Sequence, residues 1–539
     1  APKGDVNLFK KAVWISALTS ALVLVTSSST AAGVSTPVQA SGTGASPLAS
    51  CAAFDSTTVG QNFLNAEVEP QLAVRGGSAI TMWHQDRWSD GGAHGIGVGF
   101  SGDGGKTWGR TTLPLTKCNT DKSSPFFGYL RASDPWVSFG PDGTAYASAL
   151  AFNVALPDNA NAVAVASSTD GGATWPTLQR ITGSIFPNAE NGTDKNSTTA
   201  DPIHAGTAYT VWDTLISPTD NPDDNIHAQA FSGPAFFSRT TNGGQTWTPA
   251  TVMVDTGNRN QTIGNIIVVN PKTDVLYDFF DLIESPNTSF GQGTNNNALI
   301  AFVTSNDQGD HWTAPQVIAP FNSLGVHDPN TGKALRVGDG LEEVAVDPNS
   351  GQLYVVWESS SNFLKNDKQS DVLWDDEVLL STSTDGGKSW SNTPTVVERL
   401  KSGLPTFTPT VAVNASGTVA VTYYDTRNLT SNQTANLPTD YWVKFSTDGG
   451  KSFGNEQHIA GSFDSMTAPV ARGFFLGDYE GLQPNGAGGF LAAFVKTNCN
   501  ATDSAGQIFP TGGLCAHASS NLAPTSNTNP TDVFVAAIS

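Results

Sequence analysis

Basic residues are scarce in this chain. Lys and Arg together account for 27 of its 539 residues, against 48 Asp and Glu, which gives a formal net charge of −21. Charged residues of both signs make up only 14% of the chain, so Ser, Thr, Asn and Gly supply much of its polarity. Binding to a phosphate backbone or to an anionic membrane surface requires a basic patch, and the sequence shows none. We therefore expect neither nucleic acid nor anionic lipid as a partner.

Long apolar runs are missing after the first forty residues. Before that point, three lysines precede an apolar run from Ala12 to Val25, and Val38-Gln39-Ala40 fits a signal-peptidase site. The run is too short to cross a bilayer of roughly 30 Å comfortably. The sequence thus predicts a signal peptide over residues 1–40, a lead-in over residues 41–64 and a secreted chain with no membrane insertion.

Cysteine is rare, and several catalytic motifs are absent. The four cysteines are Cys51, Cys118, Cys499 and Cys515, and no Cys-x-x-Cys spacing indicates a metal site. Three pairings are open, of which we favour Cys51–Cys118 and Cys499–Cys515, in keeping with an oxidising compartment. The chain has no His-Glu-x-x-His motif and no phosphate loop.

One eight-residue motif occurs six times, at intervals of 63 to 78 residues. Its copies begin with Ser or Thr, continue through Asp or Asn to a glycine, and end in Trp or Phe; they span residues 101–108, 168–175, 240–247, 305–312, 383–390 and 446–453. The Asp can accept hydrogen bonds from its own turn, and the second glycine can adopt positive φ. The motif therefore predicts a tight hairpin turn whose closing aromatic ring packs between neighbouring sheets.

Each motif follows a second signature, in which two short alternating strands are joined by a turn that contains Gly. The first unit begins at Glu69-Pro70, the second at Asp134-Pro135 and the third at Asp201-Pro202, while the last begins at Asp478-Tyr479 and lacks the motif. Seven such units average about 67 residues, the length of a four-stranded blade with long loops. The sequence predicts an all-β protein, a β-propeller of four-stranded antiparallel blades over residues 65–539, with seven blades favoured and six as the alternative. The last unit lacks a fourth strand, and we expect Gly60–Leu64 to supply it.

Strand counting assigns the loops to two faces. If the first strand of each unit starts on an upper face, the eight-residue motifs all lie on the lower face. The starts of the first strands and the loops after the second strands then share the upper face, where variable chemistry can be placed.

The motif resembles the Asp box of the sialidase superfamily, and the resemblance covers residues 65–539. Sialidases use an Asp acid/base, a Tyr nucleophile paired with a Glu, and three Arg that bind the substrate carboxylate. The resemblance places the acid/base at Asp90, the nucleophile at Tyr479 and its partner at Glu342 or Glu343. A Tyr nucleophile is a known exception among glycosidases that otherwise use two carboxylates.

The arginines depart from the family pattern. Where sialidases carry Arg-Ile-Pro, this chain has Val68-Glu69-Pro70. Arg87, beside Asp86 in the first upper loop, and Arg427 and Arg472 further along are the remaining candidates for substrate binding, but their spacing does not reproduce the family's set. This difference puts recognition of sialic acid in doubt.

Carboxylates are expected to crowd the upper face. Four second strands end in an aromatic residue followed by an acid, as Trp212-Asp213, Phe280-Asp281, Trp357-Glu358 and Tyr424-Asp425. Five first strands begin near an acid, at Glu69, Asp134, Asp201, Glu342 and Asp478. Such a ring would repel a carboxylate ligand and suit sugar hydroxyls, a cationic group or Ca²⁺. In the alternative interpretation these acids accept backbone N–H groups and stabilise the ring.

Three functional hypotheses follow. The first is a secreted glycoside hydrolase that acts on an extracellular glycan or glycoprotein, as a monomer, with no required cofactor and with Ca²⁺ as an option. The second is a propeller without catalysis that binds a glycan or a protein through the same upper face. The third is a polysaccharide lyase or another enzyme on the same scaffold.

Overall fold

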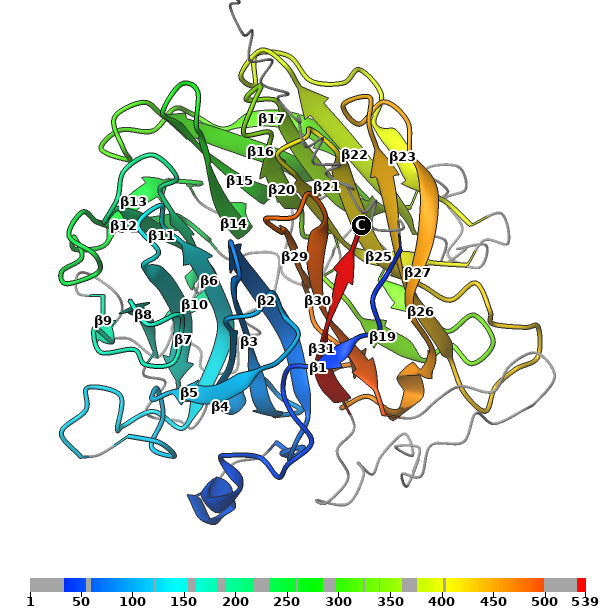
Figure 1. Cartoon of the computed structure of the whole chain (residues 1–539), viewed down its shortest axis with the longest axis horizontal. Helices are drawn as coiled ribbons and strands as arrows, with labels where there is room; N and C mark the ends of the chain where they lie inside the picture. Colours follow the sequence, from blue (N-terminus) through cyan, green and yellow to red (C-terminus); the bar gives the residue numbers. More distant parts are fainter. Residues whose placement is uncertain are drawn as a thin grey trace, which may run out of the picture. The chain divides into compact units, whose positions relative to one another are not determined.

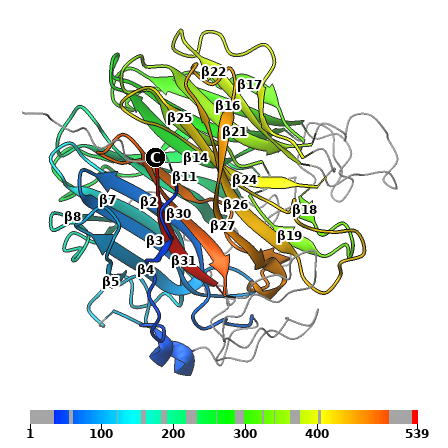
Figure 2. The ribbon, with the colours of Figure 1, turned by 45° about the vertical axis from the view of Figure 1, so that its right-hand side comes forward.

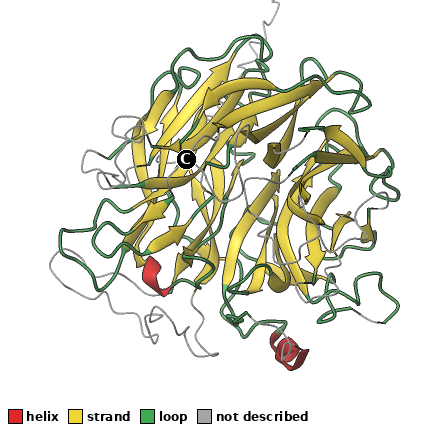
Figure 3. Cartoon of the chain, turned by 180° about the vertical axis from the view of Figure 1, so that it is seen from behind, coloured by secondary structure: helices red, strands yellow, loops and turns green. Residues whose placement is uncertain are grey.

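We analysed a computed structural model of the chain. It describes residues 33–54, 60–120, 122–153, 161–181, 191–216, 232–257, 260–284, 297–322, 325–338, 340–360, 376–400, 404–498 and 531–539. Strands dominate the described residues, with short 3-10 helices at η1 (Ala49–Phe54) and η3 (Ser465–Thr467) (Figure 3). No helix among the described residues is both long and apolar enough to cross a membrane.

Most of the strands form antiparallel groups of four, numbered here in chain order (Figure 1). Sheet 1 contains β2 (Glu67–Arg75), β3 (Ser78–Arg87), β4 (Ala93–Ser101) and β5 (Gly109–Leu113). Sheet 2 contains β6 (Arg131–Phe139), β7 (Ala145–Phe152), β8 (Asn161–Ser168) and β9 (Gln179–Arg180), and a bridge between Ala93 and Ala132 joins it to sheet 1. Sheet 3 contains β10 (Asn191–Ala200), β11 (Ala208–Ile216), β12 (Ala235–Thr240) and β13 (Thr251–Val254). Sheet 4 contains β14 (Asn260–Asn270), β15 (Val275–Glu284), β16 (Asn297–Ser305) and β17 (Gln316–Pro320).

The remaining strands complete three further groups of four and one smaller sheet. Sheet 5 contains β20 (Glu343–Val346), β21 (Leu353–Ser359), β22 (Glu377–Ser383) and β23 (Thr395–Glu398). Sheet 6 contains β24 (Thr406–Val413), β25 (Val419–Asp425), β26 (Pro438–Ser446) and β27 (Gly454–Asp464). Sheet 7 contains β29 (Gly481–Pro484), β30 (Phe490–Thr497), β31 (Thr531–Ile538) and β1 (Val38–Gln39). The smaller sheet pairs β18 (Val326–His327) and β19 (Ala334–Arg336) with β28 (Phe474–Phe475).

The first strands of these sheets follow one another around a ring. β2 packs beside β6, and the contacts continue through β10, β14, β20, β24 and β29 back to β2. Figure 2 shows the closing part of this ring, where β30 and β31 lie beside β2 and β3. Apolar residues fill the spaces between neighbouring sheets, for example Tyr209 and Phe237 of sheet 3 against Ile267 and Phe280 of sheet 4. The all-β architecture of four-stranded antiparallel sheets is consistent with a β-propeller.

The eight-residue motif forms the expected hairpin turn. Asp103 Oδ1 accepts the backbone N–H groups of Lys106 and Thr107 at 3.0 and 2.9 Å, and Gly105 has a φ of 84°. The indole N–H of Trp108 donates to the carbonyl oxygen of Gly105 at 3.0 Å. The Trp rings also pack between sheets as predicted: Trp312 after β16 lies 5.6 Å from Phe237 of sheet 3, and Trp390 after β22 lies 5.6 Å from Phe302 of sheet 4, measured between ring centroids.

The motifs lie at the lower end of the sheets, as strand counting predicted. The N–H of Gly104 donates to the carbonyl oxygen of Gly77 at 2.8 Å, and that of Gly243 donates to Gly206 at 2.8 Å. Both acceptors belong to turns between a first and a second strand. The motifs and these turns therefore share one face, and the starts of the first strands lie at the other.

The closing strand of sheet 7 is not the predicted one. Val38 and Gln39 pair with Val535 and Phe534 of β31, whereas Asn62 of the predicted donor Gly60–Leu64 forms a bridge with Trp88 of sheet 1. The physical reason is that β31 needs a partner beside its outer edge, and residues 60–64 are already held by the end of β3. Cleavage after Ala40, which the sequence predicts, would remove β1 from sheet 7.

The third unit also begins earlier than predicted. Its first strand is β10, and Asp201-Pro202 follows that strand in the turn toward β11. β10 reads Asn-Gly-Thr-Asp-Lys-Asn-Ser-Thr-Thr-Ala, with no apolar alternation to mark it. Of the two predicted disulfides, Cys51–Cys118 is present, and Cys499–Cys515 lies outside the described residues.

Candidate functional site

The upper ends of the first strands carry β-bulges at equivalent positions. The pairing register shifts in β2, β6, β10, β14 and β24, and each shift contains a residue with positive φ. These residues are Glu69 (54°), Asp134 (50°), Lys195 (41°), Gly264 (79°) and Thr408 (49°). Bulges re-aim side chains, and left-handed backbone at residues other than glycine is strained and concentrates at functional sites. The bulges therefore place strained backbone at the upper end of the ring, which makes this end the candidate functional surface.

A side chain of the preceding sheet binds the backbone N–H of four of these bulge residues. His84 Nε2 accepts the N–H of Asp134 at 2.7 Å, and Asp134 Oδ2 accepts that of Lys195 at 3.0 Å. Asp213 Oδ1 accepts the N–H of Gly264 at 3.4 Å, and Glu358 Oε2 accepts that of Thr408 at 2.9 Å. The geometry at Asp213 and Glu358 matches the alternative interpretation, in which these acids stabilise the ring.

Lys195 brings carboxylates of two other sheets together. Its Nζ lies 2.6 Å from Asp478 Oδ2, in the segment that leads into β29, and 3.3 Å from Glu69 Oε1 of β2. Burial opposes the charge of the ammonium group, but Asp478, Asp134 and Glu69 outweigh this effect and raise the pKa of Lys195. Burial would likewise raise the pKa of Glu69, yet Lys195 and His84 hold that pKa well below its ordinary value. The result is a buried network of opposite charges.

Arg336 adds a second cation to Asp478. Its guanidinium donates to Asp478 Oδ2 at 2.8 Å and lies 4.5 Å above the ring of Phe475. Arg336 belongs to β19. Because β19 pairs with β28 in parallel, Arg336 lies opposite Phe475 in this sheet. The Asp478 carboxylate is therefore held between two cations from different parts of the chain.

His84, Glu69 and Asp134 could be considered as a metal site, since their ligand atoms lie within 4.8 Å of one another. His84 Nδ1 lies 3.0 Å from Glu69 Oε2, but His84 Nε2 already accepts the Asp134 N–H. The Lys195 ammonium also supplies the positive charge that these carboxylates need. This group of three offers fewer oxygen ligands than the six to eight that Ca²⁺ prefers.

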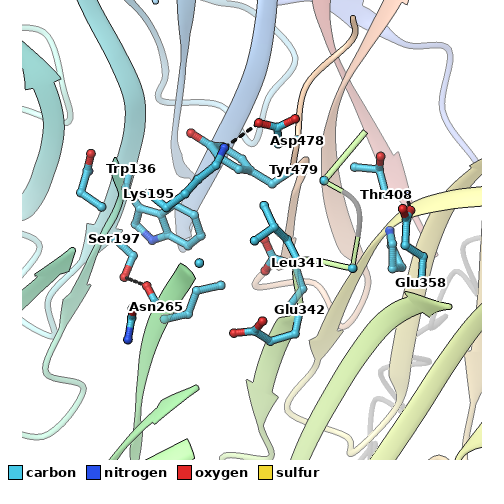
Figure 4. A pocket seen from close by; sticks show the side chains of 17 residues that line it. Trp136, Lys195, Ser197, Asn265, Leu341, Glu342, Glu358, Thr408, Asp478 and Tyr479 are labelled. Atoms are coloured by element: carbon cyan, nitrogen blue, oxygen red, sulfur yellow. Dashed lines mark hydrogen bonds and ion pairs between the residues drawn. The ribbon is translucent and has the colours of Figure 1, made fainter. Parts of the chain in front are cut away.

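A narrow pocket opens between the bulges (Figure 4). Its wall includes Lys195, Asp478, Glu343 and the rings of Trp136 and Tyr479, whose centroids are 5.4 Å apart. Further lining residues are Asn196, Ser197, Gly264, Asn265, Ile266, Gly338, Gly340, Leu341, Glu342, Glu358, Thr408 and Pro409. The cavity volume is about 20 Å³, room for little more than one water molecule. Leu341 occupies the middle of the view in Figure 4.

Two predicted carboxyl groups in the pocket wall have raised pKa values. Burial raises the pKa of Glu343 to about 8. Burial, followed by the neighbouring Asp281 carboxyl group, raises the pKa of Glu342 well above its ordinary value. Glu343 therefore lies, with its raised pKa, in the same pocket as the ion-paired Asp478.

Tyr479 lines the pocket with its ring. The hydroxyl donates to the carbonyl oxygen of Pro135 at 3.4 Å, and the Lys195 ammonium lies 5.4 Å from the ring centroid. Burial, with Asp134 and Glu69 as further causes, raises the pKa of Tyr479 well above its ordinary value. A nucleophile needs the opposite shift or an adjacent base. The raised pKa opposes formation of a phenolate, while the ring of Tyr479 forms part of the pocket wall.

The predicted residues of the first upper loop lie outside the pocket lining. Asp90 pairs with Arg131, with 2.6 Å between Oδ1 and NH1, and Asp86 Oδ2 accepts the hydroxyl of Ser46 at 2.7 Å. Arg87 is buried and donates to the carbonyl oxygen of Gly92 at 2.6 Å. The structure does not bring Asp90 together with Tyr479, because Arg131 holds Asp90 at the neighbouring strand β6.

Other predicted binding residues are also outside the pocket lining. Arg427 pairs with Asp425 at the end of β25, with Oδ2 2.5 Å from NH2, and lies 3.8 Å above the ring of Trp442. Trp357 is fully buried in the core between sheets 4 and 5. Arg472 is exposed, just before β28. Of the predicted set, Tyr479, Glu342, Glu343 and Glu358 meet in one pocket.

Sequence reasoning missed the cations of this site. Lys195 occupies in β10 the bulge position that Glu69 and Asp134 occupy in β2 and β6, so an alignment of Asp194-Lys195-Asn196 with the earlier units would have found it. Arg336 belongs to a connection outside the repeat and left no comparable signal. Lys195 and Arg336 give cationic partners to Glu69 and Asp478, two of the acids expected at the upper face.

No protein-family model and no curated protein sequence matches this chain. Among solved structures, the chain is similar to an α-L-arabinanase of Penicillium chrysogenum, with a TM-score of 0.41 and 14% identity over 72% of this chain and 93% of that chain. It is also similar to a Hadza microbial sialidase, with a TM-score of 0.40 and 13% identity over 77% of this chain and 70% of that chain. For a Trypanosoma rangeli sialidase with the inhibitor DANA the TM-score is 0.38 and the identity 12%, over 67% of this chain and 53% of that chain. These structural neighbours are glycoside hydrolases, but similarity at this level does not assign an activity to this chain.

Proposed function

We propose that this protein is a secreted, monomeric, seven-bladed propeller that hydrolyses a glycosidic bond of an extracellular glycan in the pocket of Figure 4. The ring of first strands from β2 to β29 supports the blade number, with sheets 1 to 7 as the blades. The disulfide Cys51–Cys118 supports an oxidising, extracellular compartment.

One observation carries the proposal: two carboxyl groups of the same pocket lie in different surroundings, Asp478 beside two cations and Glu343 in a buried position that raises its pKa. Asp478 is paired with Lys195 and Arg336, while burial raises the pKa of Glu343 to about 8. Hydrolysis of a glycosidic bond needs one carboxylic acid to protonate the leaving oxygen and one carboxylate to act as nucleophile or base. We assign the acid to Glu343 and the carboxylate to Asp478.

The other pocket residues suit a sugar. Trp136 and Tyr479 offer ring faces on which the apolar face of a pyranose or furanose can stack. Lys195 and Asn196 offer N–H donors to hydroxyl groups. A sugar ring is larger than the present cavity, so binding requires the wall around Leu341 to move outward.

A non-catalytic glycan-binding propeller is the second candidate. The small cavity and the two cationic partners of Asp478 Oδ2 favour it, because a carboxylate that already has two cationic partners is a weaker nucleophile. Both candidates place the sugar on the same surface, so a test must measure binding and turnover separately.

The test uses the purified full chain with aryl glycosides of neutral pentoses and hexoses and of sialic acid. We expect turnover of at least one substrate, with a loss of at least 100-fold in kcat for Glu343→Gln and Asp478→Asn. Asp255→Asn is the matched control, since Asp255 is an exposed turn residue whose hydrogen bond to Gly257 an Asn retains.

Three outcomes distinguish the candidates. Glycan binding without turnover by the wild type supports the second candidate. Loss of activity in Asp90→Asn with normal activity in Asp478→Asn contradicts our assignment and restores Asp90 as the acid/base. Absence of both binding and turnover overturns the glycan-acting proposal.

A further inference from the structure

A second group of chemically suitable side chains lies at the opposite end of the sheets from the pocket. Asp201 and His204 belong to the turn between β10 and β11 of sheet 3, and Asp274 belongs to the turn between β14 and β15 of sheet 4. The N–H of Gly243 in the third eight-residue motif donates to Gly206 of the same turn, which places the group on the lower face. It is therefore separate from the charge network around Lys195.

The distances between the ligand atoms of this group match those between neighbouring ligands of a metal ion. His204 Nδ1 lies 3.0 Å from Asp201 Oδ2 and 3.6 Å from Asp274 Oδ1, and the three atoms all lie within 4.8 Å of one another. Ligands about 2.1 Å from a tetrahedral zinc ion are separated from each other by roughly 3.4 Å. An ion could therefore bind between the three atoms with only small side-chain movements.

Asp201 is held in place as a metal-binding carboxylate requires. Its side chain is fully buried, and Oδ1 accepts the backbone N–H groups of Ile203 at 2.7 Å and His204 at 2.9 Å. The hydroxyl of Tyr209 donates to Oδ2 at 2.7 Å. Hydrogen bonds of this kind orient metal ligands and are a regular part of metal sites.

Asp274 supplies a second observation. Its Oδ1 is shielded from solvent and has no hydrogen-bond partner among the described residues, although it is directed toward His204. A buried carboxylate oxygen without a donor is costly, and a bound cation would satisfy it. The side chains of His204 and Asp274 are 38% and 44% exposed, so an ion and its water ligands can reach the site.

We propose that Asp201, His204 and Asp274 bind one divalent first-row transition ion, with Zn²⁺ as the best fit. An imidazole nitrogen with two carboxylates suits such an ion, whereas Ca²⁺ prefers more oxygen ligands than this group provides. Binding replaces the proton on His204 Nδ1, which is released to solvent. The ion would join the turns of sheets 3 and 4, so its role is to stabilise their contact.

The experiment is a calorimetric titration of the EDTA-treated full chain with ZnCl₂ at pH 7.5, with a thermal melt at each endpoint. We expect one equivalent of Zn²⁺ to bind the wild type and raise its Tm by a few degrees. The affinity should fall at least tenfold in both His204→Ala and Asp274→Asn. His311→Ala is the matched control, because His311 lies 2.7 Å from Asp307 in an exposed pair that lacks the third ligand.

Unchanged Zn²⁺ affinity in His204→Ala, or no Zn²⁺ binding by the wild type, would overturn the proposal. Equal loss of affinity in His311→Ala would also overturn it, since the signal would then come from exposed histidines in general. A parallel titration with CaCl₂ should give weaker binding, and tighter binding of Ca²⁺ than of Zn²⁺ would contradict the assigned class of ion. None of these readouts depends on glycosidase activity.

Discussion

Lys195 and Asp478 are 283 residues apart in the sequence, and their charged atoms lie 2.6 Å from each other. The contact joins sheet 3 to the segment that leads into sheet 7, across the upper end of the ring. The side chains of Lys195 and Asp478 are only 10% and 4% exposed, so neither charge can be satisfied by water if the other is removed. The pair therefore links the stability of the ring to the chemistry of the pocket.

Replacing Lys195 with Met should destabilise the protein by about 3–5 kcal/mol, the usual effect of removing one partner of a buried ion pair. Asp478 and Glu69 would be left without their shared cation, while Met keeps the volume of the side chain. Chemical denaturation compared with Lys106→Met, a change at an exposed lysine, measures the effect. Equal stability of the two variants would show that Arg336 and water compensate for the loss.

The stability of the protein should fall as the pH rises from about 4.3 to 8. Burial raises the pKa of Glu343 to about 8 in the folded state, whereas an unfolded Glu titrates near about 4.3. Because the folded pKa is raised, this group's contribution is complete below about pH 4.3 and is lost as the pH rises through about 8. Glu69 and Asp134 have lowered pKa values, so their contribution is lost instead as the pH falls through the acidic range.

Thermal melts between pH 4.5 and 9 test whether the stability falls as the pH rises. We expect a higher Tm at pH 5 than at pH 8.5, with a smaller difference in Glu343→Gln, whose side chain does not titrate. Asp255→Asn should keep the wild-type profile. A wild-type Tm that rises steadily toward pH 8.5 would show that the raised pKa of Glu343 does not control stability.

In the eight-residue motif, the Trp should matter more to stability than the Asp. Trp175 is 8% exposed and packs in the core of sheets 1 and 2, whereas Asp170 Oδ1 and Oδ2 accept the N–H and the hydroxyl of Thr174 at an exposed turn. Trp175→Ala should destabilise by about 3–5 kcal/mol and Asp170→Ala by about 1–2 kcal/mol. Denaturation curves of the two variants provide the comparison, and a larger effect for Asp170→Ala would contradict it.

Local features of this fold were predictable, and contacts between distant segments were not. The turn of Ser101 to Trp108 follows from Asp and Gly at fixed offsets, because its hydrogen bonds form within eight residues. The position of Lys195 was missed because β10 has no apolar alternation, so a later Asp-Pro pair was taken for the start of the strand. The partner of β31 was missed because competition between two N-terminal segments for one sheet edge leaves no local pattern.

For the candidate site, the sequence indicated the acids but not the groups that surround them. Glu343 and Asp478 were both expected at the upper face. Burial then distinguishes Glu343, and two cationic partners distinguish Asp478. Those partners come from Lys195 in sheet 3 and from Arg336 outside the repeat. A charge state depends on the three-dimensional environment, and no spacing in the sequence reports it.

The N-terminal strand β1 gives the last prediction, since it closes sheet 7. Ser35 donates its N–H to Ala537 at 2.8 Å, Ala40 donates to Val533 at 2.9 Å, and Ala40 is fully buried in the core beside β31. A chain that begins at Gly33 should therefore keep the Tm of the full-length protein, whereas a chain that begins at Ser41 should melt several degrees lower and expose the edge of β31. Unpaired edges of this kind promote aggregation, so light scattering should rise with the loss of β1. Intact-mass measurement of the protein from a secreting host tests the predicted cleavage after Ala40. A mature chain that begins at Ser41 with an unchanged Tm would show that β1 is dispensable for ring closure.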